Sequence, residues 1–283
     1  MGQCSRPTGP GSDGPSGVVA AGPDGYRPVR MDVHPVAAGG FAAAAPTYAR
    51  IRPTYARGAI GAIKDRTVAG GTVLDVAAGT GILSGQLVRA RLDVLAVEPV
   101  EEMLVQLVRT LPQVPAVRGV AELLPIADAR VDTVVVGEAF HWFDVPRALS
   151  EVARVLRPGG RLVMLWNRRD ESVDWVAQLS RILLSERPEG RPYRTETDWV
   201  EPVAAAGGFG EHRLERFDNP RPCSPQSLVD RAASTSFIAA ADAAARERVL
   251  ARVRDLTTQH PQLSGRERFD LPYVTESWSW TRE

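Results

Sequence analysis

The apolar positions of the chain form short continuous runs that alternate with stretches of helical spacing. Residues 73–76 are one such run, residues 77–81 form a turn of small residues, and residues 82–87 have the spacing of a helix. Short apolar runs bounded by turns indicate buried strands, whereas apolar positions three and four apart indicate a helix packed against a core. Residues 72–87 therefore predict a strand, a tight glycine turn and a helix.

The same alternation continues to residue 166. Further buried strands are predicted at 92–97, 116–119, 131–136 and 161–166, with helices at 100–111 and 146–156. Strands that alternate with helices form a parallel sheet with helices on both faces. The pattern thus predicts an α/β fold with a doubly wound, mostly parallel sheet.

The alternation loosens after residue 167. Helical spacing occupies 175–185, 199–206 and most of 224–259, and strand-like patterns occupy 212–217 and 275–281. We expect a disordered tail rich in glycine and proline at 1–35, a core with N-terminal cap helices at 36–222, a helical insert or lid at 223–265, and a terminal strand that completes the sheet at 266–283. The cap helices are expected within 41–64, split near Pro53.

Composition limits the partners and the location of the protein. The chain has 283 residues, and its 34 Lys and Arg balance its 34 Asp and Glu. This balance gives no positive field for a nucleic acid or an anionic membrane, so we expect a small molecule as the partner. We expect the protein to be a monomer or a homodimer. The cysteines, Cys4 and Cys223, provide neither a disulfide framework nor a metal cluster. No apolar run approaches the roughly 20 residues of a membrane span. We expect a cytoplasmic protein without a metal.

The glycine turn favours a nucleoside-type cofactor. Gly79 and Gly81 can adopt positive φ and bring backbone close to a ligand, and the following helix begins with unpaired N–H groups. Glu98 ends the second predicted strand, where an acid accepts hydrogen bonds from ribose hydroxyls in doubly wound folds; a stabilising charge at a helix start is the alternative. The dinucleotide fingerprint has a third glycine where this chain has Ser84, which weakens the alternative of an NAD(P)-dependent oxidoreductase.

Five stretches, in order, resemble the class I S-adenosylmethionine-dependent methyltransferases with a methyltransferase type 11 domain. They are VLDVAAGTG (73–81), LAVEPVEEML (95–104), AELLP (121–125), VDTVVVGEAFHWF (131–143) and RVLRPGGRLVMLW (154–166). The resemblance implies a seven-stranded Rossmann-like sheet, S-adenosylmethionine as cofactor and S-adenosylhomocysteine as product. YARIRPTY (48–55) and the run AFHWF look like the trans-aconitate-type branch of small-molecule methyltransferases.

The resemblance also implies which residues bind the cofactor. The methionine end would be held by Asp75 and by the turn, whose residues include Ala77, Gly79, Thr80 and Gly81. The nucleoside would be held by Glu98 at the ribose, Pro99 and Met103 against adenine, and Ala121 and Glu122 at the adenine edge. Glu138 would lie near the transferring methyl group. Ala77 stands where the family pattern usually has glycine.

Tyr48, Arg52 and Tyr55 group around the break at Pro53. In one interpretation Tyr48 and Arg52 contact the cofactor and Tyr55 contacts the acceptor. In the other, the tyrosines pack the first helix onto the sheet and Arg52 is solvated. Arg52, Arg168 and Arg169 are also candidates to grip an acidic acceptor, against the alternative of a surface role.

Methyl transfer from a sulfonium is an in-line displacement, which gains most from alignment of the nucleophile with the methyl group. The acceptor is expected to be an O-, N- or C-nucleophile; a carboxylate needs no base, whereas a hydroxyl, phenol or carbon nucleophile does. His141 follows the fourth predicted strand and is the candidate base, with orientation of a loop as its alternative role. Trp142 and Phe143 either wall the acceptor pocket or pack the next helix. A protein that binds S-adenosylmethionine without turnover is the remaining alternative.

Overall fold

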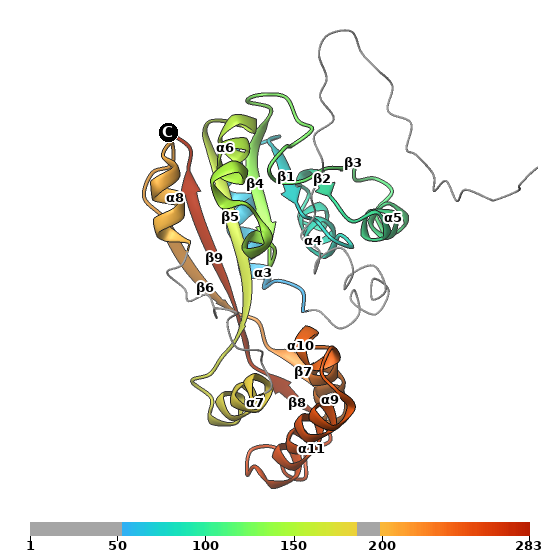
Figure 1. The fold of residues 1–283 in the computed structure, drawn as a ribbon. Coiled ribbons are helices and arrows are strands. Elements are labelled where there is room, and N and C mark those ends of the chain that lie inside the picture. The colour runs from blue at the N-terminus through green and yellow to red at the C-terminus, as the bar shows by residue number, and fades with distance from the viewer. Residues whose placement is uncertain (1–52, 186–198) are drawn as a thin grey trace, which may run out of the picture. The chain divides into compact units, whose positions relative to one another are not determined.

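A computed structural model describes residues 53–185 and 199–283, all within one compact unit, Met31–Glu283. A sheet with the strand order β3-β2-β1-β4-β5-β9-β6 forms its centre (Figure 1). The strands are β1 (Thr72–Val76), β2 (Asp93–Glu98), β3 (Ala116–Arg118), β4 (Val131–Gly137), β5 (Leu156–Arg169), β6 (Arg213–Asp218) and β9 (Tyr273–Thr281). Strand β9 is antiparallel to its neighbours β5 and β6, and the other pairings are parallel. The predicted mostly parallel, seven-stranded α/β sheet is confirmed.

Helices cover both faces of this sheet. They are α3 (Arg57–Arg66), α4 (Ile82–Arg89), α5 (Glu101–Thr110), α6 (Val145–Val155) and α8 (Val200–Ala206). Val73 and Leu74 are adjacent on β1 and fully buried, yet they belong to different apolar clusters, one with α3 and α4 and the other with α6 and α8. Successive strand residues point to opposite faces, so a strand covered on both sides is continuously apolar. This burial explains why apolar residues face both sides of β1, at Val73, Leu74 and Val76, with Asp75 as the buried polar residue among them.

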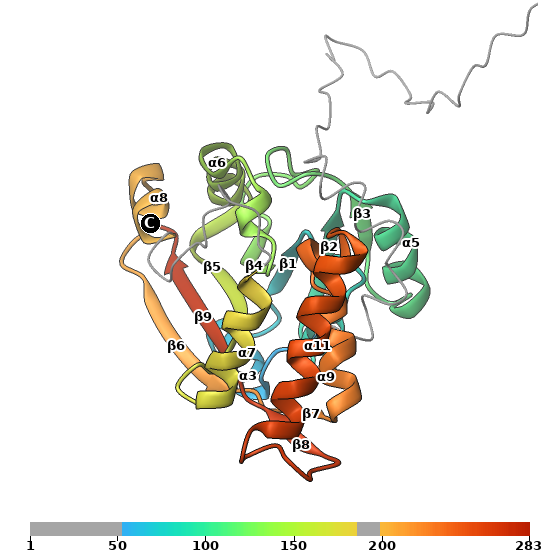
Figure 2. The ribbon, with the colours of Figure 1, turned by 60° about the horizontal axis from the view of Figure 1, so that its bottom comes forward.

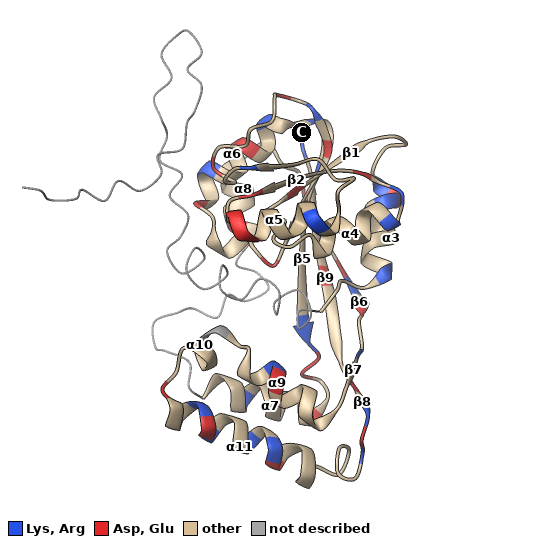
Figure 3. Ribbon diagram, turned by 90° about the vertical axis from the view of Figure 1, so that its right-hand side faces the viewer, with Lys and Arg blue, Asp and Glu red and all other residues tan. Residues whose placement is uncertain are grey.

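A second apolar core lies beyond the ends of β5 and β9. It is built by α7 (Asp174–Leu184), α9 (Pro225–Ala233), α10 (Ser236–Ala239), α11 (Ala243–Gln259), and a two-stranded antiparallel sheet of β7 (Arg221–Cys223) with β8 (Phe269–Leu271). Helix α11 packs against α7 and α9, as Figure 2 shows. It buries Val253 and Leu256 and exposes Arg252 and Asp255, and Figure 3 shows positive and negative positions interspersed along it.

Local side-chain caps begin helices α9 and α11 of this second core. Asp242 accepts a hydrogen bond from the backbone N–H of Ala245 at 2.7 Å, and Ser224 and Ser227 form a reciprocal capping box at the start of α9. Such caps satisfy N–H groups that the first turn of a helix leaves unpaired. Helices α9 and α11 therefore begin at separate caps, Ser224 and Asp242, which explains why the helical pattern of 224–259 is divided.

Two features of the strands differ from the sequence prediction. Strand β5 begins at Leu156, which pairs with Val131, and the register then shifts so that Thr133 pairs with Arg161. The residues between, RPGG, interrupt the apolar pattern, so the prediction placed the start of the strand at 161. The β7–β8 pair was not predicted, because strands of three residues each give too little alternation to recognise.

Several expectations fall outside the described residues, namely the tail at 1–35, the first cap helix and the side chains of Tyr48 and Arg52. Across the two described ranges, no helix is both long enough and apolar enough to cross a bilayer.

Candidate active site

The turn after β1 is held in an unusual backbone conformation. Ala77, Gly79 and Gly81 have φ values of 57°, 58° and 85°. Left-handed backbone costs a non-glycine residue about 1–2 kcal/mol, so Ala77 adopts at some cost the conformation that glycine adopts freely. Gly81 is also packed closely, because a Cβ there would lie 2.9 Å from Leu111 Cδ1. The turn therefore presents its backbone at the carboxyl end of β1.

Glu98 fixes this turn from the neighbouring strand. Its side chain is buried, one carboxylate oxygen accepts a hydrogen bond from the N–H of Gly79 at 2.8 Å, and the other accepts from Val100 at 2.9 Å. Burial raises the pKa of Glu98, and the two backbone bonds counteract that rise. Met103 also lies against the turn, because its sulfur is 3.8 Å from the position that a Cβ of Gly79 would occupy.

Asp75 lies beneath the turn and is 1% exposed. Ser84 Oγ donates a hydrogen bond to its carboxylate at 2.6 Å. Burial raises the pKa of Asp75 to about 7, the Ser84 bond opposes the shift, and the charge of Glu98 adds to it. Asp75 therefore exchanges its proton near neutral pH.

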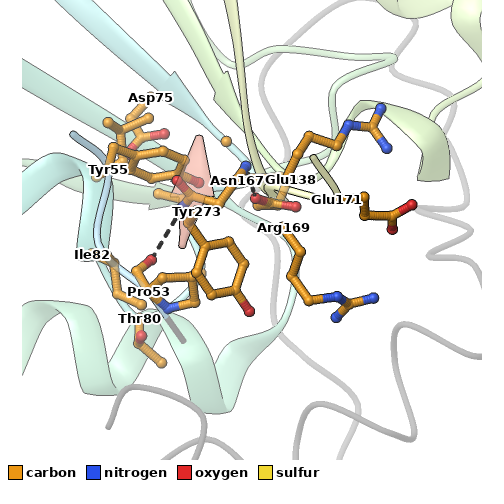
Figure 4. A pocket seen from close by; sticks show the side chains of 16 residues that line it. Pro53, Tyr55, Asp75, Thr80, Ile82, Glu138, Asn167, Arg169, Glu171 and Tyr273 are labelled. Atoms are coloured by element: carbon orange, nitrogen blue, oxygen red, sulfur yellow. Dashed lines mark hydrogen bonds between the residues drawn. The ribbon is translucent and has the colours of Figure 1, made fainter. Parts of the chain in front are cut away.

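A cleft of about 220 Å³ opens at the carboxyl ends of β1, β4 and β5 (Figure 4). The predicted site residues that line it are Tyr55, Asp75, Ala77, Gly79, Thr80 and Glu138. The hydroxyl oxygen of Thr80 is buried in this wall without a hydrogen-bond partner in the described part of the chain. Side chains that the sequence predicted from separate motifs therefore meet in one cavity.

Tyr55 closes one side of the cleft. Its backbone N–H and carbonyl both bond to the Gln86 side chain, each at 2.8 Å. A Cβ added at Gly137 would overlap the Tyr55 hydroxyl, so the end of β4 must be glycine for the ring to lie where it does. Glu138, the next residue, has a φ of 60° and accepts a hydrogen bond from the N–H of Asn167 at 2.6 Å.

The far end of the cleft carries charged and aromatic side chains. Figure 4 shows Tyr55 and Tyr273 toward one side of the cavity and Arg169 and Glu171 toward the other. Arg169 Nε donates to Ser180 Oγ at 2.9 Å. Arg168 also lines the cleft, with its Nε 3.5 Å from a carboxylate oxygen of the buried Glu276. The arrangement offers positively and negatively charged hydrogen-bonding groups to a polar ligand.

Other predicted cofactor residues do not line the cleft. They are Gly81, Glu98, Pro99, Met103, Ala121 and Glu122. Pro99 accepts a hydrogen bond from Arg118 Nε at 3.2 Å, Ala121 is buried in the core, and Glu122 accepts one from the N–H of Asp144 at 2.8 Å.

The run after β4 forms a short 3-10 helix, η1 (Phe140–Trp142). His141 is exposed, and its ring lies 4.6 Å from the Trp142 ring and 5.5 Å from the Trp166 ring, centroid to centroid. Phe143 packs edge-on to Phe140 at 5.5 Å. His141, Trp142 and Phe143 are not among the residues that line the cleft.

Sequence reasoning missed Asn167, Tyr273, Glu171, Pro53, Ile82 and Leu83 as lining residues. Asn167 was within reach, since it follows Trp166 at the carboxyl end of a predicted strand, the position that singled out Glu98 and Glu138. Tyr273 was not, because it comes to the cleft through the pairing of β9 with β5, where it lies opposite Arg169. Sequence patterns within one strand do not show such pairing.

Comparison with known proteins identifies the family. A family model described as a methyltransferase domain matches residues 74–164. An uncharacterized methyltransferase of Mycobacterium tuberculosis strain H37Rv is 44% identical over 203 residues, which cover 72% of this chain and 80% of that relative. The chain is a class I S-adenosylmethionine-dependent methyltransferase. This membership excludes the oxidoreductase alternative.

The methyltransferase also resembles more distant proteins. Malonyl-[acyl-carrier protein] O-methyltransferase of Methylococcus capsulatus is 46% identical over 96 residues, 32% of this chain and 35% of that relative. A solved structure of a candidate type II methyltransferase from Anaeromyxobacter dehalogenans covers 82% of this chain and 97% of its own, with a TM-score of 0.64 and 24% identity. The structural likeness shows the shared fold.

S-adenosylmethionine is the cofactor of the methyltransferase, and the residues of the cleft and of the adjoining strand end fit it. The Thr80 hydroxyl, which has no partner among the described residues, and the left-handed turn offer hydrogen-bonding groups to an amino-acid end. The buried carboxylate of Glu98 stands beside the turn, where a ribose would find an acceptor.

Proposed function

We propose that this methyltransferase methylates a small molecule bound at the far end of the cleft, beside Arg169, Glu171 and Tyr273. One observation carries the proposal: the cleft runs from the turn at 77–80 to these polar and aromatic side chains without a break. Both ends of one cavity would then serve the two reactants. Alignment of two bound reactants is the main advantage that a protein offers to an in-line displacement.

The cofactor, when bound, supplies an activated methyl group on a sulfonium sulfur. We assign Asp75 and the turn of Ala77, Gly79, Thr80 and Gly81 to its methionine end, and Glu98 to its ribose. Pro99, Met103, Ala121 and Glu122 are assigned to adenine, and Glu138 to the region of the methyl group. Tyr48 and Arg52, an aromatic and a cationic residue close to the break at Pro53 in the sequence, are also assigned to the cofactor. The hydrogen bond between Glu98 and Gly79 supports a joint role of the turn and the acid.

Tyr55, Trp142 and Phe143 are assigned to the acceptor. The contact of the Tyr55 ring with Gly137, inside the cleft, supports the first assignment. His141 is the proposed base for an acceptor that must lose a proton. A carboxylate acceptor would need no base, and Arg168 and Arg169 are then the side chains that would hold it.

The proposal includes membership of the trans-aconitate-type branch, a monomeric or homodimeric state and a helical lid at 223–265. The runs YARIRPTY and AFHWF support the branch. The malonyl-[acyl-carrier protein] relative is named for methylation of an oxygen, and its match supports the search for an oxygen acceptor among carboxylates and secondary metabolites.

The test is titration calorimetry with S-adenosylmethionine and S-adenosylhomocysteine, with NADH and NADPH as control ligands. Methyl transfer to a panel of small carboxylates, phenols and amines is then followed by release of S-adenosylhomocysteine. We expect binding of the sulfur nucleosides alone and turnover of one class of acceptor. Tight cofactor binding without transfer to any panel member, under conditions in which a known methyltransferase is active, would contradict the proposal and favour a non-catalytic binding protein.

A further inference from the structure

The segment 53–56 lies against the cleft without belonging to any helix or strand. Its polar groups are nevertheless bonded from several directions. Asn219 Nδ2 donates to the carbonyl of Thr54 at 2.7 Å, and Arg221 donates to the Thr54 hydroxyl at 2.8 Å. The N–H of Ala56 donates to Thr275 Oγ1 at 3.0 Å. Side chains far along the chain therefore fix the segment that carries Pro53 and Tyr55 into the cavity.

Asn167, Asn219 and Thr275 form one cluster, which we call the amide cluster. The Asn167 side-chain oxygen accepts hydrogen bonds from Asn219 Nδ2 at 2.9 Å and from Thr275 Oγ1 at 2.6 Å. Asn219 is 6% exposed and Thr275 is fully buried. Buried polar groups are costly unless they are bonded, and a satisfied network holds its members in one geometry.

The amide cluster joins three walls of the cleft. The N–H of Asn167 donates to the Glu138 carboxylate at 2.6 Å, next to the end of β4. The N–H of Asn219 donates to the carbonyl of Tyr273 at 2.7 Å, at the start of β9. The third wall is the segment 53–56. Asn219 does not line the cleft itself, so any effect on a bound ligand must pass through the residues that it holds.

We propose that Asn219 is a positioning residue, whose side chain sets Tyr55 on the cleft by clamping segment 53–56 to Asn167 at the end of β5. This inference rests on the proposed function, in which the cleft holds the cofactor and the acceptor. The Asn219 side chain bonds at the same time to the Thr54 carbonyl and to the Asn167 side chain, and so it links segment 53–56 to the end of β5.

The test is the variant Asn219→Ala in the full chain. We expect it to weaken binding of S-adenosylhomocysteine by about tenfold, as the loss of hydrogen bonds that hold a binding surface implies. We also expect faster hydrogen exchange at the amides of Tyr55 and Ala56, whose bonds to Gln86 and Thr275 depend on the position of the segment. Thr275→Val, nearly equal in shape, is the second variant if Asn219→Ala does not fold.

Thr133→Val is the matched control. Thr133 is 1% exposed on β4 and shares a hydrogen bond of 3.0 Å with Thr67, but it makes no bond to segment 53–56. It should lower the melting temperature without changing ligand affinity or exchange at Tyr55 and Ala56. Unchanged affinity and exchange in Asn219→Ala, or equal losses in the control, would overturn the positioning role. Failure of the unmodified protein to transfer methyl groups would instead count against the proposed function and leave both readouts available.

Discussion

Glu98 accepts a hydrogen bond from the backbone N–H of Gly79 at 2.8 Å, so the acid at the end of β2 and the turn after β1 form one structural unit. The second carboxylate oxygen accepts a hydrogen bond from the N–H of Val100, the residue that precedes α5. The acid thus fixes the turn as well as offering a negative group beside it. Its removal should disturb two parts of the proposed cofactor site together.

Glu98→Gln tests this unit. Glutamine retains the length of the side chain but replaces one acceptor oxygen with an NH₂ group, which would face a backbone N–H that needs an acceptor. We expect binding of S-adenosylhomocysteine to weaken by about 1–3 kcal/mol, measured by calorimetry. Glu101→Gln is the control, because that acid is 69% exposed and pairs with Arg118. Equal affinities of the two variants would remove Glu98 from the site.

Gly137→Ala tests the position of Tyr55. The added methyl group would overlap the Tyr55 hydroxyl and must displace the ring from the cleft. We expect a loss of about 1–3 kcal/mol in the free energy of unfolding, typical of overpacking, together with weaker cofactor binding. Chemical denaturation and calorimetry measure the two effects.

Gly61→Ala is its matched control on α3, where a Cβ would have no atom within 4 Å. That variant should be more stable by about 0.5–1 kcal/mol, because alanine favours a helix interior more than glycine does. Normal stability and affinity in Gly137→Ala would show that the ring moves aside without consequence.

The parallel half of the sheet could be predicted because its strands are buried on both faces. Val73 and Leu74 serve different cores, and this produces a continuous apolar run that the sequence displays directly. Glu98, at the end of one such run, could be predicted for the same reason, whereas the role of Glu138 was implied by the family resemblance. Their position at the carboxyl end of a strand follows from the fold class alone.

The remaining part of the cleft depends on pairing between distant segments. Tyr273 reaches it because β9 lies antiparallel to β5, and Asn219 reaches Thr54 across 165 positions of the chain. Neither contact leaves a periodic signal in the sequence. The amide cluster is therefore visible only in the three-dimensional structure, because each of its residues alone has no distinctive place in the sequence pattern.

His141→Ala tests the proposed base. His141 is exposed and does not line the cleft, so cofactor affinity should be unchanged. Turnover of an acceptor that must lose a proton should fall by about 10²–10⁴-fold, the usual contribution of general base catalysis. His212→Ala is the control, because that ring stacks on Trp278 at 5.4 Å, away from the cleft. If steady-state assays find full turnover in His141→Ala, orientation of the loop becomes its only assigned role.

Asp75 predicts a dependence of stability on pH. Burial raises its pKa from an ordinary 3.8 to about 7 in the folded protein. Between these values the folded state carries the proton and the unfolded state does not, so unfolding releases a proton. The contribution of Asp75 to stability is therefore fully present below the lower value and is lost as pH rises through about 7. The expected slope is up to about 1.4 kcal/mol per pH unit.

Asp75→Asn removes the titrating group and retains an oxygen that can accept the hydrogen bond from Ser84. The melting temperature of the unmodified protein should fall, relative to that of the variant, as pH rises from 5 to 8 without ligand. Scanning calorimetry at four pH values measures the difference, and Asp93→Asn, at an exposed position on β2, is the control that should follow the unmodified protein. If the melting temperatures of Asp75→Asn and of the unmodified protein change in parallel with pH, the pKa of Asp75 is the same in the folded and the unfolded state. A widening gap would show that this carboxyl is held protonated by the fold, next to the turn that we assign to the cofactor.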